Sequence, residues 1–279
     1  RTKNEEKWIG HCLSAIFSQN YKDFEVILVD NLSTDKTVEK AKKWPIKLVE
    51  LKDFFPGDAI NKGIEASNGE YISCLSGHCI PSNKNWLKNL IHPLKDKKIA
   101  GVYGRQVPLS SSHNLDKRDL FVVFGKDKRI QENETYFHNA NSAFTRRIWK
   151  KFPFDSEVTN IEDRLWGEEV ISKGLKIAYE PSAEVFHHHG INQEGDKRRA
   201  SNIVKILEKT SFELDNELPD RWDGSIKQLE SDLLGRGGWK NTSQFLRMLN
   251  GTIKYVILRN FEDLPEKFIS NEHNDIDIL

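Results

Sequence analysis

The stretch Glu25-Val-Ile-Leu-Val-Asp30, followed by Asn31-Leu-Ser-Thr-Asp35, decides the fold of this chain. A short apolar run that ends in an acid is typical of a parallel strand buried on both faces. The polar residues after it supply a turn and the N-cap of a helix that runs to about Lys43. The two segments therefore predict one strand–turn–helix unit.

The same unit repeats along the first two-thirds of the chain. Further strands are predicted at 46–51, 71–75, 99–107 and 176–188, and helices at 5–19, 58–67, 83–94, 145–151 and 161–173. This rhythm predicts an α/β fold with a doubly wound, mostly parallel sheet and right-handed crossovers. We expect its opening strand to precede Arg1, outside the given sequence. Ligands of such sheets bind beyond the carboxyl ends of the strands.

Composition argues against several classes of protein. The 279 residues carry 42 Lys+Arg and 42 Asp+Glu, and this zero net charge argues against a nucleic-acid binder. The cysteines, Cys12, Cys74 and Cys79, are too few for a disulfide framework or a Cys-based zinc site, which favours a reducing, cytoplasmic setting. No apolar run approaches the ~20 residues of a membrane span.

Several segments lie where ligands of such a sheet bind. Arg1-Thr-Lys-Asn-Glu5 opens the first helix, whose N-terminus favours an anionic or nucleotide ligand; plain helix capping is the alternative. Asp30 could accept a hydrogen bond from a base or ribose, although a strand-end Asp is more often a turn former. In Leu75-Ser-Gly-His-Cys-Ile-Pro81, Gly77 permits close backbone approach to a ligand. His78 is a candidate metal ligand or a structural histidine.

The segment Asn160-Ile-Glu-Asp-Arg-Leu-Trp166 begins a predicted helix. Glu162 and Asp163 lie in its first turn, where the helix dipole stabilises a carboxylate. This position suits a catalytic base that is ionised at neutral pH. The alternative is that the two acids are ordinary negative charges at a helix N-terminus.

A histidine run, Val185-Phe-His-His-His-Gly190, ends the last extended segment. Strand alternation places His187 and His189 on one face. These two imidazoles could complete a metal site with His78, or the run could be a solvated strand end.

Together these segments resemble the family 2 glycosyltransferases of the GT-A fold, from Arg1 to about residue 190. The first six residues resemble the family's opening turn, and Val29-Asp-Asn-Leu-Ser-Thr-Asp35 resembles its V-D-[DN]-x-S-x-D segment. Ala59-Ile-Asn-Lys-Gly-Ile64 with Asn68-Gly-Glu-Tyr-Ile72 resembles the block A-x-N-x-G-I…G-E-Y-I. Glu162-Asp163 resembles the E-D motif that supplies the catalytic base.

One segment departs from the family pattern. Ser76-Gly77-His78 stands where the family usually has Asp-x-Asp, and it is similar to a sub-branch with Ser-[Ala/Gly]-His. The resemblance then implies a histidine-held divalent cation, Mn²⁺ or Mg²⁺, with Mn²⁺ favoured because the acidic ligands are gone. His78 would bind the cation with His187 or His189.

The resemblance implies an inverting transfer of a sugar from a UDP- or dTDP-sugar to a hydroxyl of a saccharide or lipid-linked acceptor, in polysaccharide or glycoconjugate synthesis. Asp163 would be the base, with Glu162 supporting it, and Asn139 and Asn141 could contact a sugar. Nucleotide-sugar binding is implied for Thr2, Lys3, Glu5, Asp30, Asn61, Ser76 and Gly77.

The boundary of the catalytic domain is predicted near residue 195. Residues 196–279 are charge-rich, and we expect a mainly helical C-terminal extension. The basic, apolar pattern from Trp239 to Arg259 could lie on an anionic membrane surface at the inner face of the membrane, or pack on the catalytic domain or a second subunit. Two alternative functions stay open: an inactive nucleotide-sugar-binding protein and a His-metal hydrolase.

Overall fold

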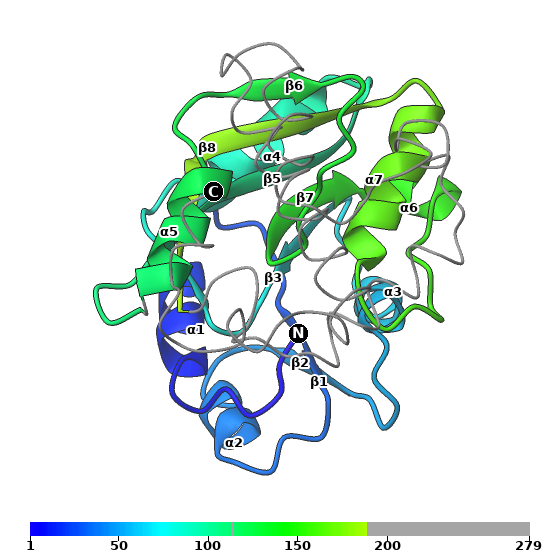
Figure 1. The fold of residues 1–279 in the computed structure, drawn as a ribbon. Helices are drawn as coiled ribbons and strands as arrows, with labels where there is room; N and C mark the ends of the chain where they lie inside the picture. The colour runs from blue at the N-terminus through cyan, green and yellow to red at the C-terminus, as the bar shows by residue number, and fades with distance from the viewer. Residues whose placement is uncertain (113, 189–279) are drawn as a thin grey trace, which may run out of the picture. The chain divides into compact units, whose positions relative to one another are not determined.

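The computed structural model describes residues 1–112 and 114–188, which form a mixed α/β fold (Figure 1). The described residues all belong to one compact unit, Arg1–Glu194. The predicted extension over 196–279 and its surface helix lie outside the described residues. No helix within the described ranges combines the length and apolar character that crossing a bilayer requires.

The strands form a parallel pair, β1 with β2, and a six-stranded mixed sheet. The order of the larger sheet is β3-β7-β5-β8-β4, with β6 paired to β8. The β5–β8 ladder is parallel, whereas β7, β4 and β6 run antiparallel to their neighbours. The strands are β1 (Ile27–Asp30), β2 (Lys47–Glu50), β3 (Tyr71–Leu75), β4 (Cys79–Pro81), β5 (Ile99–Pro108), β6 (Arg129–Gln131), β7 (Asn141–Thr145) and β8 (Lys176–His187).

The predicted helices are present; most are shorter than predicted, and α3 is shifted two residues toward the N-terminus. The first begins four residues later than predicted because residues 5–8 form a turn. Pro56 opens α3, where its missing N–H is harmless, and the Thr145 hydroxyl caps α6 by accepting from Ile148 N (3.2 Å). The helices are α1 (Ile9–Phe17), α2 (Thr37–Ala41), α3 (Pro56–Glu65), α4 (Trp86–Ile91), the 3₁₀ turn η1 (His92–Lys95), α5 (Asn114–Val123), α6 (Arg146–Lys151) and α7 (Glu162–Ser172).

The α/β prediction is confirmed, but three strands and one helix were not foreseen. The stretch 108–136, where no strand or helix is among those predicted, contains α5 and β6. The short strands β4 and β7 were also missed. All five residues of β7 are buried, so the strand shows no alternation of polar and apolar residues that would reveal it.

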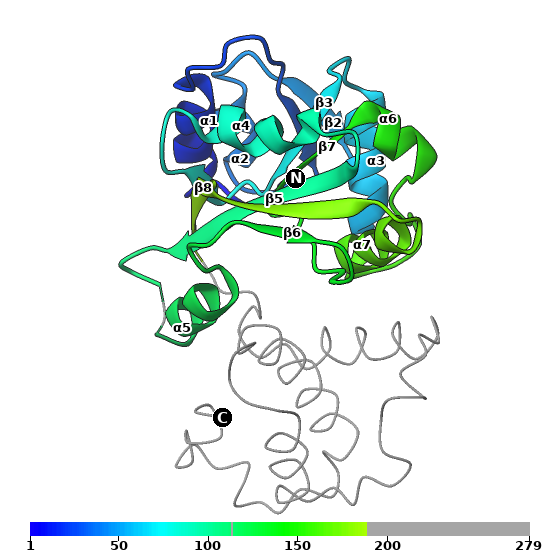
Figure 2. The same ribbon diagram turned by 90° about the horizontal axis from the view of Figure 1, so that it is seen from above.

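Alternate residues of β5 enter two separate cores. Val102 packs in a cluster with Trp86 and Leu90 of α4, whereas Tyr103 packs in a cluster with Trp166 and other residues of α3, α5, α6 and α7. Figure 2 shows α4 and α7 on opposite sides of the β5–β8 ladder. The sheet is therefore covered on both faces, and its strand ends are the place left for a site.

Trp166 is the largest fully enclosed side chain of α7, and its removal should be strongly destabilising. It is 2% exposed, its ring lies 4.7 Å from the Phe137 ring, and its Nε1 donates to Phe152 O (2.9 Å). Trp166→Ala should lower the free energy of unfolding by about 3–5 kcal/mol, measured by urea denaturation. Phe121→Ala is the control: Phe121 is 55% exposed, so its change should stay within about 0.5 kcal/mol. Equal effects of the two variants would contradict this account.

Candidate active site

The N-terminal turn is paired along its length with the turn that follows β1. The backbone of Thr2 bonds to both neighbours of Asp30, through Thr2 N to Val29 O (2.9 Å) and Asn31 N to Thr2 O (3.0 Å). Farther along, Thr34 N donates to the Asn4 side chain (2.8 Å). The opening-turn motif and the motif that follows β1 therefore form one structure, so each turn needs the other to hold its shape.

Asp30 is the centre of these paired turns. It is fully buried, and its carboxylate accepts from Thr2 Oγ1 (2.9 Å), Ser33 N (2.7 Å) and Ser33 Oγ (2.6 Å). The Lys3 ammonium donates to the backbone oxygens of Asn31 and Leu32. The contacts described here show that the turn is held in shape by the side chains of Thr2, Lys3 and Asp30. Any effect of these side chains on ligand binding depends on the shape of the turn.

Gly77 lies directly against the N-terminal turn. Its N–H donates to Arg1 O (3.1 Å), and a Cβ at this position would come within 2.5 Å of the Thr2 methyl carbon. Ser76 is fixed on the other side, since its N–H donates to Ala140 O (3.1 Å). Only a residue without a side chain fits here, so Gly77 allows the loop after β3 to approach the opening turn.

His78 and His187 face each other at the end of the sheet. Their Nε2 atoms are 3.1 Å apart, and their rings are parallel within 6° with centroids at 5.0 Å. The outer nitrogen of each ring meets an oxygen: His78 Nδ1 is 2.6 Å from Glu5 Oε1, and His187 Nδ1 is 2.6 Å from Gln106 Oε1. Pairing of β4 with β8 brings the two histidines together.

The donor set fits a divalent cation. A carboxylate and an amide oxygen accept hydrogen bonds, so each outer nitrogen carries a proton, and in the neutral form of each ring the inner Nε2 presents its lone pair. Two lone pairs at 3.1 Å repel unless a cation or a shared proton lies between them. Carboxylate and amide partners of this kind are what orient metal-binding histidines. Imidazole nitrogens suit Mn²⁺-like ions better than Mg²⁺.

Cys79 completes this cluster but is a poorer ligand. Among the described residues, the ligand atoms of His78, Cys79 and His187 lie within 4.8 Å of one another. Burial, with the nearby Cys12 and Glu5, raises the pKa of the Cys79 thiol well above its ordinary value. A thiol in this setting is a poorer donor than the two imidazoles. His189 lies outside the described residues.

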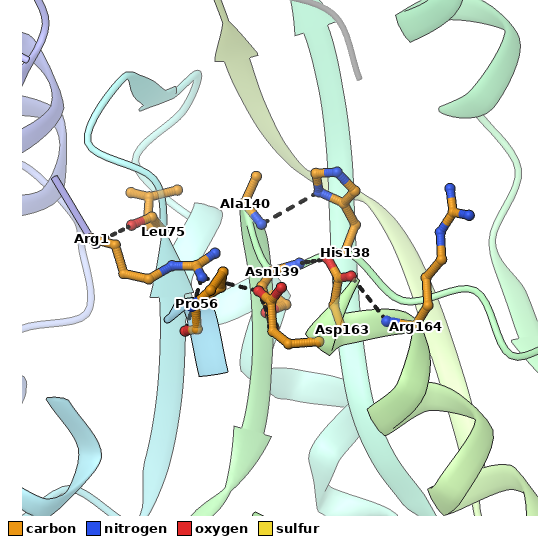
Figure 3. Close-up of polar contacts among 10 residues, drawn as sticks. Arg1, Pro56, Leu75, His138, Asn139, Ala140, Asp163 and Arg164 are labelled. Atoms are coloured by element: carbon orange, nitrogen blue, oxygen red, sulfur yellow. Dashed lines mark hydrogen bonds and ion pairs between the residues drawn. The ribbon is translucent and has the colours of Figure 1, made fainter. Parts of the chain in front are cut away.

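Glu162 and Asp163 occupy different environments at the start of α7 (Figure 3). Glu162 is buried, and its Oε1 accepts from Arg1 Nη1 (3.0 Å) and Asn139 Nδ2 (3.4 Å). Asp163 is half-buried and accepts from the backbone N–H of Asn139 (3.1 Å) and Arg164 (2.9 Å). Figure 3 shows Arg1 on one side of Asn139 and Asp163 on the other. Asn139 thus holds both acids.

Charge and backbone geometry separate the roles of the two acids further. Burial, and then the Asp163 charge, raise the pKa of Glu162, while the Arg1 guanidinium opposes the shift.

Ile161, the residue before the two acids, has φ of +60°, a left-handed conformation that β-branched residues rarely adopt. Strained backbone of this kind clusters at functional sites.

Arg1 connects the two ends of the site. Its backbone oxygen accepts from Gly77 N, next to His78, and its guanidinium reaches Glu162, next to Asp163. The guanidinium also donates to Pro56 O (3.1 Å). The histidine pair and the acid pair therefore belong to one connected edge of the sheet.

Two of the residues expected to contact a ligand have their side-chain amides engaged inside the protein. Asn61 was expected to bind the nucleotide sugar, but its amide joins α3 to the following core by bonds to Phe154 O (2.7 Å), Phe154 N (3.2 Å) and Trp149 Nε1 (2.9 Å). Asn141 was expected to contact a sugar, but it is fully buried and bonds to Trp86 Nε1 (3.0 Å) and to backbone oxygens. Both amides are satisfied inside the protein.

A hollow of about 430 Å³ also lies against α7, but neither His78 nor Asp163 lines it. Its lining residues are Pro153, Phe154, Asp155, Ser156, Glu157, Leu165, Trp166 and Glu169. This hollow is therefore separate from the paired histidines and from the half-buried acid.

Comparison with known proteins gives consistent matches. The model of the family described as "Glycosyl transferase family 2" matches residues 1–153. The O-antigen chain rhamnosyltransferase WbaN of Salmonella anatum is 24% identical over 198 residues, which are 66% of this chain and 63% of that protein. A dolichyl N-acetyl-alpha-D-glucosaminyl phosphate 3-beta-D-2,3-diacetamido-2,3-dideoxy-beta-D-glucuronosyltransferase of Methanococcus voltae is 32% identical over 204 residues, 65% of this chain and 63% of that protein. The match thus spans about 63% of the length of these relatives.

Solved structures share the fold. The mannosyltransferase PcManGT of Pyrobaculum calidifontis, in complex with GDP-Man and Mn²⁺, has a TM-score of 0.60 at 17% identity and covers 95% of this chain and 86% of its own. TarS 1–349 of Staphylococcus aureus, in complex with UDP-GlcNAc, has a TM-score of 0.56 at 17% identity and covers 75% of this chain and 64% of its own. At these identities the likeness shows the fold alone.

The paired turns should depend on the ionised form of Asp35. Its carboxylate accepts from Glu6 N (3.0 Å), Thr37 N (2.9 Å) and Thr37 Oγ1. Desolvation opposes ionisation, but these hydrogen bonds prevail and lower the pKa of Asp35. A folded-state pKa below the unfolded value, about 3.9, stabilises the protein above that pH and loses the effect as pH falls through the folded value.

Asp35→Asn should therefore lower the melting temperature at pH 7, and the difference from wild type should shrink as the pH falls below about 4. Thermal melts across this pH range measure it. Asp23→Asn, at an exposed position, is the control and should change little. A difference for Asp35→Asn that is the same at every pH would contradict the assignment.

The contact between Gly77 and Thr2 can be tested by a double-mutant cycle. Gly77→Ala places a methyl group against the Thr2 methyl and should destabilise the protein by about 1–3 kcal/mol. Thr2→Ser removes the obstructing methyl and keeps the hydroxyl that bonds to Asp30. The double variant should recover most of the loss in urea denaturation. Additive effects would show that the clash lies elsewhere.

Proposed function

Because the chain belongs to glycosyl transferase family 2, we propose that it moves a sugar from a nucleoside-diphosphate donor to an acceptor hydroxyl, with inversion at the anomeric carbon. The observation that carries this proposal is the half-buried Asp163, held by backbone N–H groups on the same connected edge as the His78–His187 pair. The named relatives include transferases of O-antigen and dolichyl-linked sugars, which supports a saccharide or lipid-linked acceptor in glycoconjugate synthesis.

The donor is proposed to bind along the paired turns. The backbone of residues 1–5 and 30–34 would line the nucleoside, in the shape that Thr2, Lys3 and Asp30 maintain. His78 and His187 would hold a divalent cation, which supplies positive charge against the charge that develops on the leaving diphosphate. Structural neighbours solved with GDP-Man and Mn²⁺ and with UDP-GlcNAc support a nucleotide-sugar donor.

Asp163, rather than Glu162, is proposed to be the base. Glu162 is buried and paired with Arg1, so an acceptor hydroxyl cannot reach it without breaking an ion pair. Asp163 is reachable and would take the proton from the hydroxyl as the oxygen bonds to the anomeric carbon. The bond from that carbon to the diphosphate oxygen breaks in the same step, and its electron pair leaves with the nucleoside diphosphate.

Asp163→Asn should lower the transfer rate about 10²–10⁴-fold, because the amide cannot accept the proton. The Asp163 carboxylate is held by Asn139 and Arg164 rather than by the paired turns, so donor binding should stay intact. Thermal shifts with a panel of UDP-, dTDP- and GDP-sugars, with and without Mn²⁺, identify the donor and measure its binding. Transfer is then measured with that donor.

The matched control is Glu169→Gln, which removes an exposed carboxylate from the same helix and should leave the rate unchanged. Product analysis separates the alternatives. A new glycosidic linkage supports transfer, whereas release of free sugar in the presence of acceptors would indicate a hydrolase. Donor binding without turnover would indicate an inactive nucleotide-sugar-binding protein. Full activity of Asp163→Asn would contradict the assignment of the base.

A further inference from the structure

We propose that Gln106 and His138 form a positioning relay that holds His187 in one tautomer and connects it to the loop that holds Asp163. The relay is the chain of contacts from Ala140 N through His138 and Gln106 to His187. This inference rests on the proposed function, because it takes His187 to be a cation ligand. Neither Gln106 nor His138 would contact the donor or the cation, so both are positioning residues.

The relay begins at a group whose role is fixed. The backbone N–H of Ala140 can only donate, and it points at His138 Nδ1 at 3.4 Å. His138 Nδ1 is therefore an acceptor, and the ring carries its proton on Nε2. His138 is further held by Tyr136, whose ring stacks on it at 6.3 Å.

The orientation of the Gln106 amide follows from this assignment. The Gln106 side-chain nitrogen lies 3.0 Å from His138 Nδ1, to which it donates. The amide oxygen then faces His187 Nδ1 at 2.6 Å and accepts its proton. Gln106 is fully buried in β5, so no water competes for either contact. A buried amide in this place can satisfy both neighbours in only one orientation.

The relay determines what His187 presents to His78. With its proton held on Nδ1 by Gln106, His187 directs a lone pair from Nε2. Glu5 fixes His78 in the same way from the other side. Without the relay, His187 could place its proton on Nε2 and donate it to His78, and this hydrogen bond would occupy the position of the cation.

The same loop reaches the proposed base. Asn139 lies between His138 and Ala140, and its N–H donates to Asp163 Oδ2 (3.1 Å). One tripeptide therefore fixes the tautomer of a cation ligand through its first residue and the position of the base through its second. The relay gives the two ends of the site a second connection besides Arg1.

The experiment compares substitutions of two buried glutamines, Gln106 and Gln131. Gln106→Leu removes the relay, and Mn²⁺ affinity measured by isothermal titration should fall about 10–100-fold. Gln106→Glu keeps an acceptor for His187 Nδ1 and should stay much closer to wild type. Gln131→Leu is the matched control, because Gln131 is also buried but bonds to Tyr103 and to the backbone oxygens of Glu134 and Tyr136. It should bind Mn²⁺ like wild type.

The tautomer is read directly by ¹⁵N NMR of the imidazole rings in the metal-free protein. Wild-type His187 should carry its proton on Nδ1, and Gln106→Leu should show a mixture of tautomers. A proton on Nε2 of wild-type His187, or equal Mn²⁺ affinity of Gln106→Leu and Gln131→Leu, would overturn the relay. If the wild-type protein binds no Mn²⁺, the proposed function loses its cation site. The relay is then still tested by the tautomer of His187. The spectrum of the wild-type protein tests the relay even if the Gln106→Leu variant does not fold.

Discussion

The partly buried ion pair between Arg1 and Glu162 is the contact on which the arrangement of the site depends. The pair joins the opening turn to the start of α7, across 161 positions of sequence. A buried carboxylate is tolerated only with a partner, since an unpaired buried charge is strongly destabilising. Glu162 therefore holds the start of α7 against the Arg1 guanidinium, while the backbone oxygen of Arg1 accepts from Gly77 N. The pair thus links the opening turn, and through it Gly77, to the helix that carries Asp163.

Each group that we propose to be reactive is oriented by a neighbour to which the proposal gives no part in the chemistry. Glu5 orients His78, Gln106 orients His187, and Asn139 orients Asp163. Groups held in advance need no reorganisation when charge develops, which is how enzymes gain most of their electrostatic stabilisation. The division between Glu162 and Asp163 follows the same logic, because one acid maintains the structure and leaves the other accessible.

The sequence predicts the parts of this molecule that rest on local pattern. The strand–turn–helix units from α1 to β5, the start of α7 and the candidate pair His78 and His187 all follow from periodicity, strand ends and motif. The strands β4 and β7 do not, because their antiparallel pairing is decided by distant partners and they are too short to show a period. A motif does not reveal every contact either: Asn61 stands in a family block, and its amide bonds to the backbone of Phe154 and to Trp149. The position of Gln106 is itself a signal of its role, since a glutamine within an apolar strand must find hydrogen-bond partners inside the protein.

Ile161 shows how such a site limits the substitutions that evolution can explore. Its backbone is left-handed, a conformation that glycine or asparagine adopts easily, yet its side chain is 8% exposed and belongs in an apolar setting. A glycine would relax the backbone and leave a void, and a valine would fill part of the space and keep the strain. No single exchange answers both demands, so we expect few substitutions to be tolerated at this position, although the isoleucine side chain itself performs no chemistry.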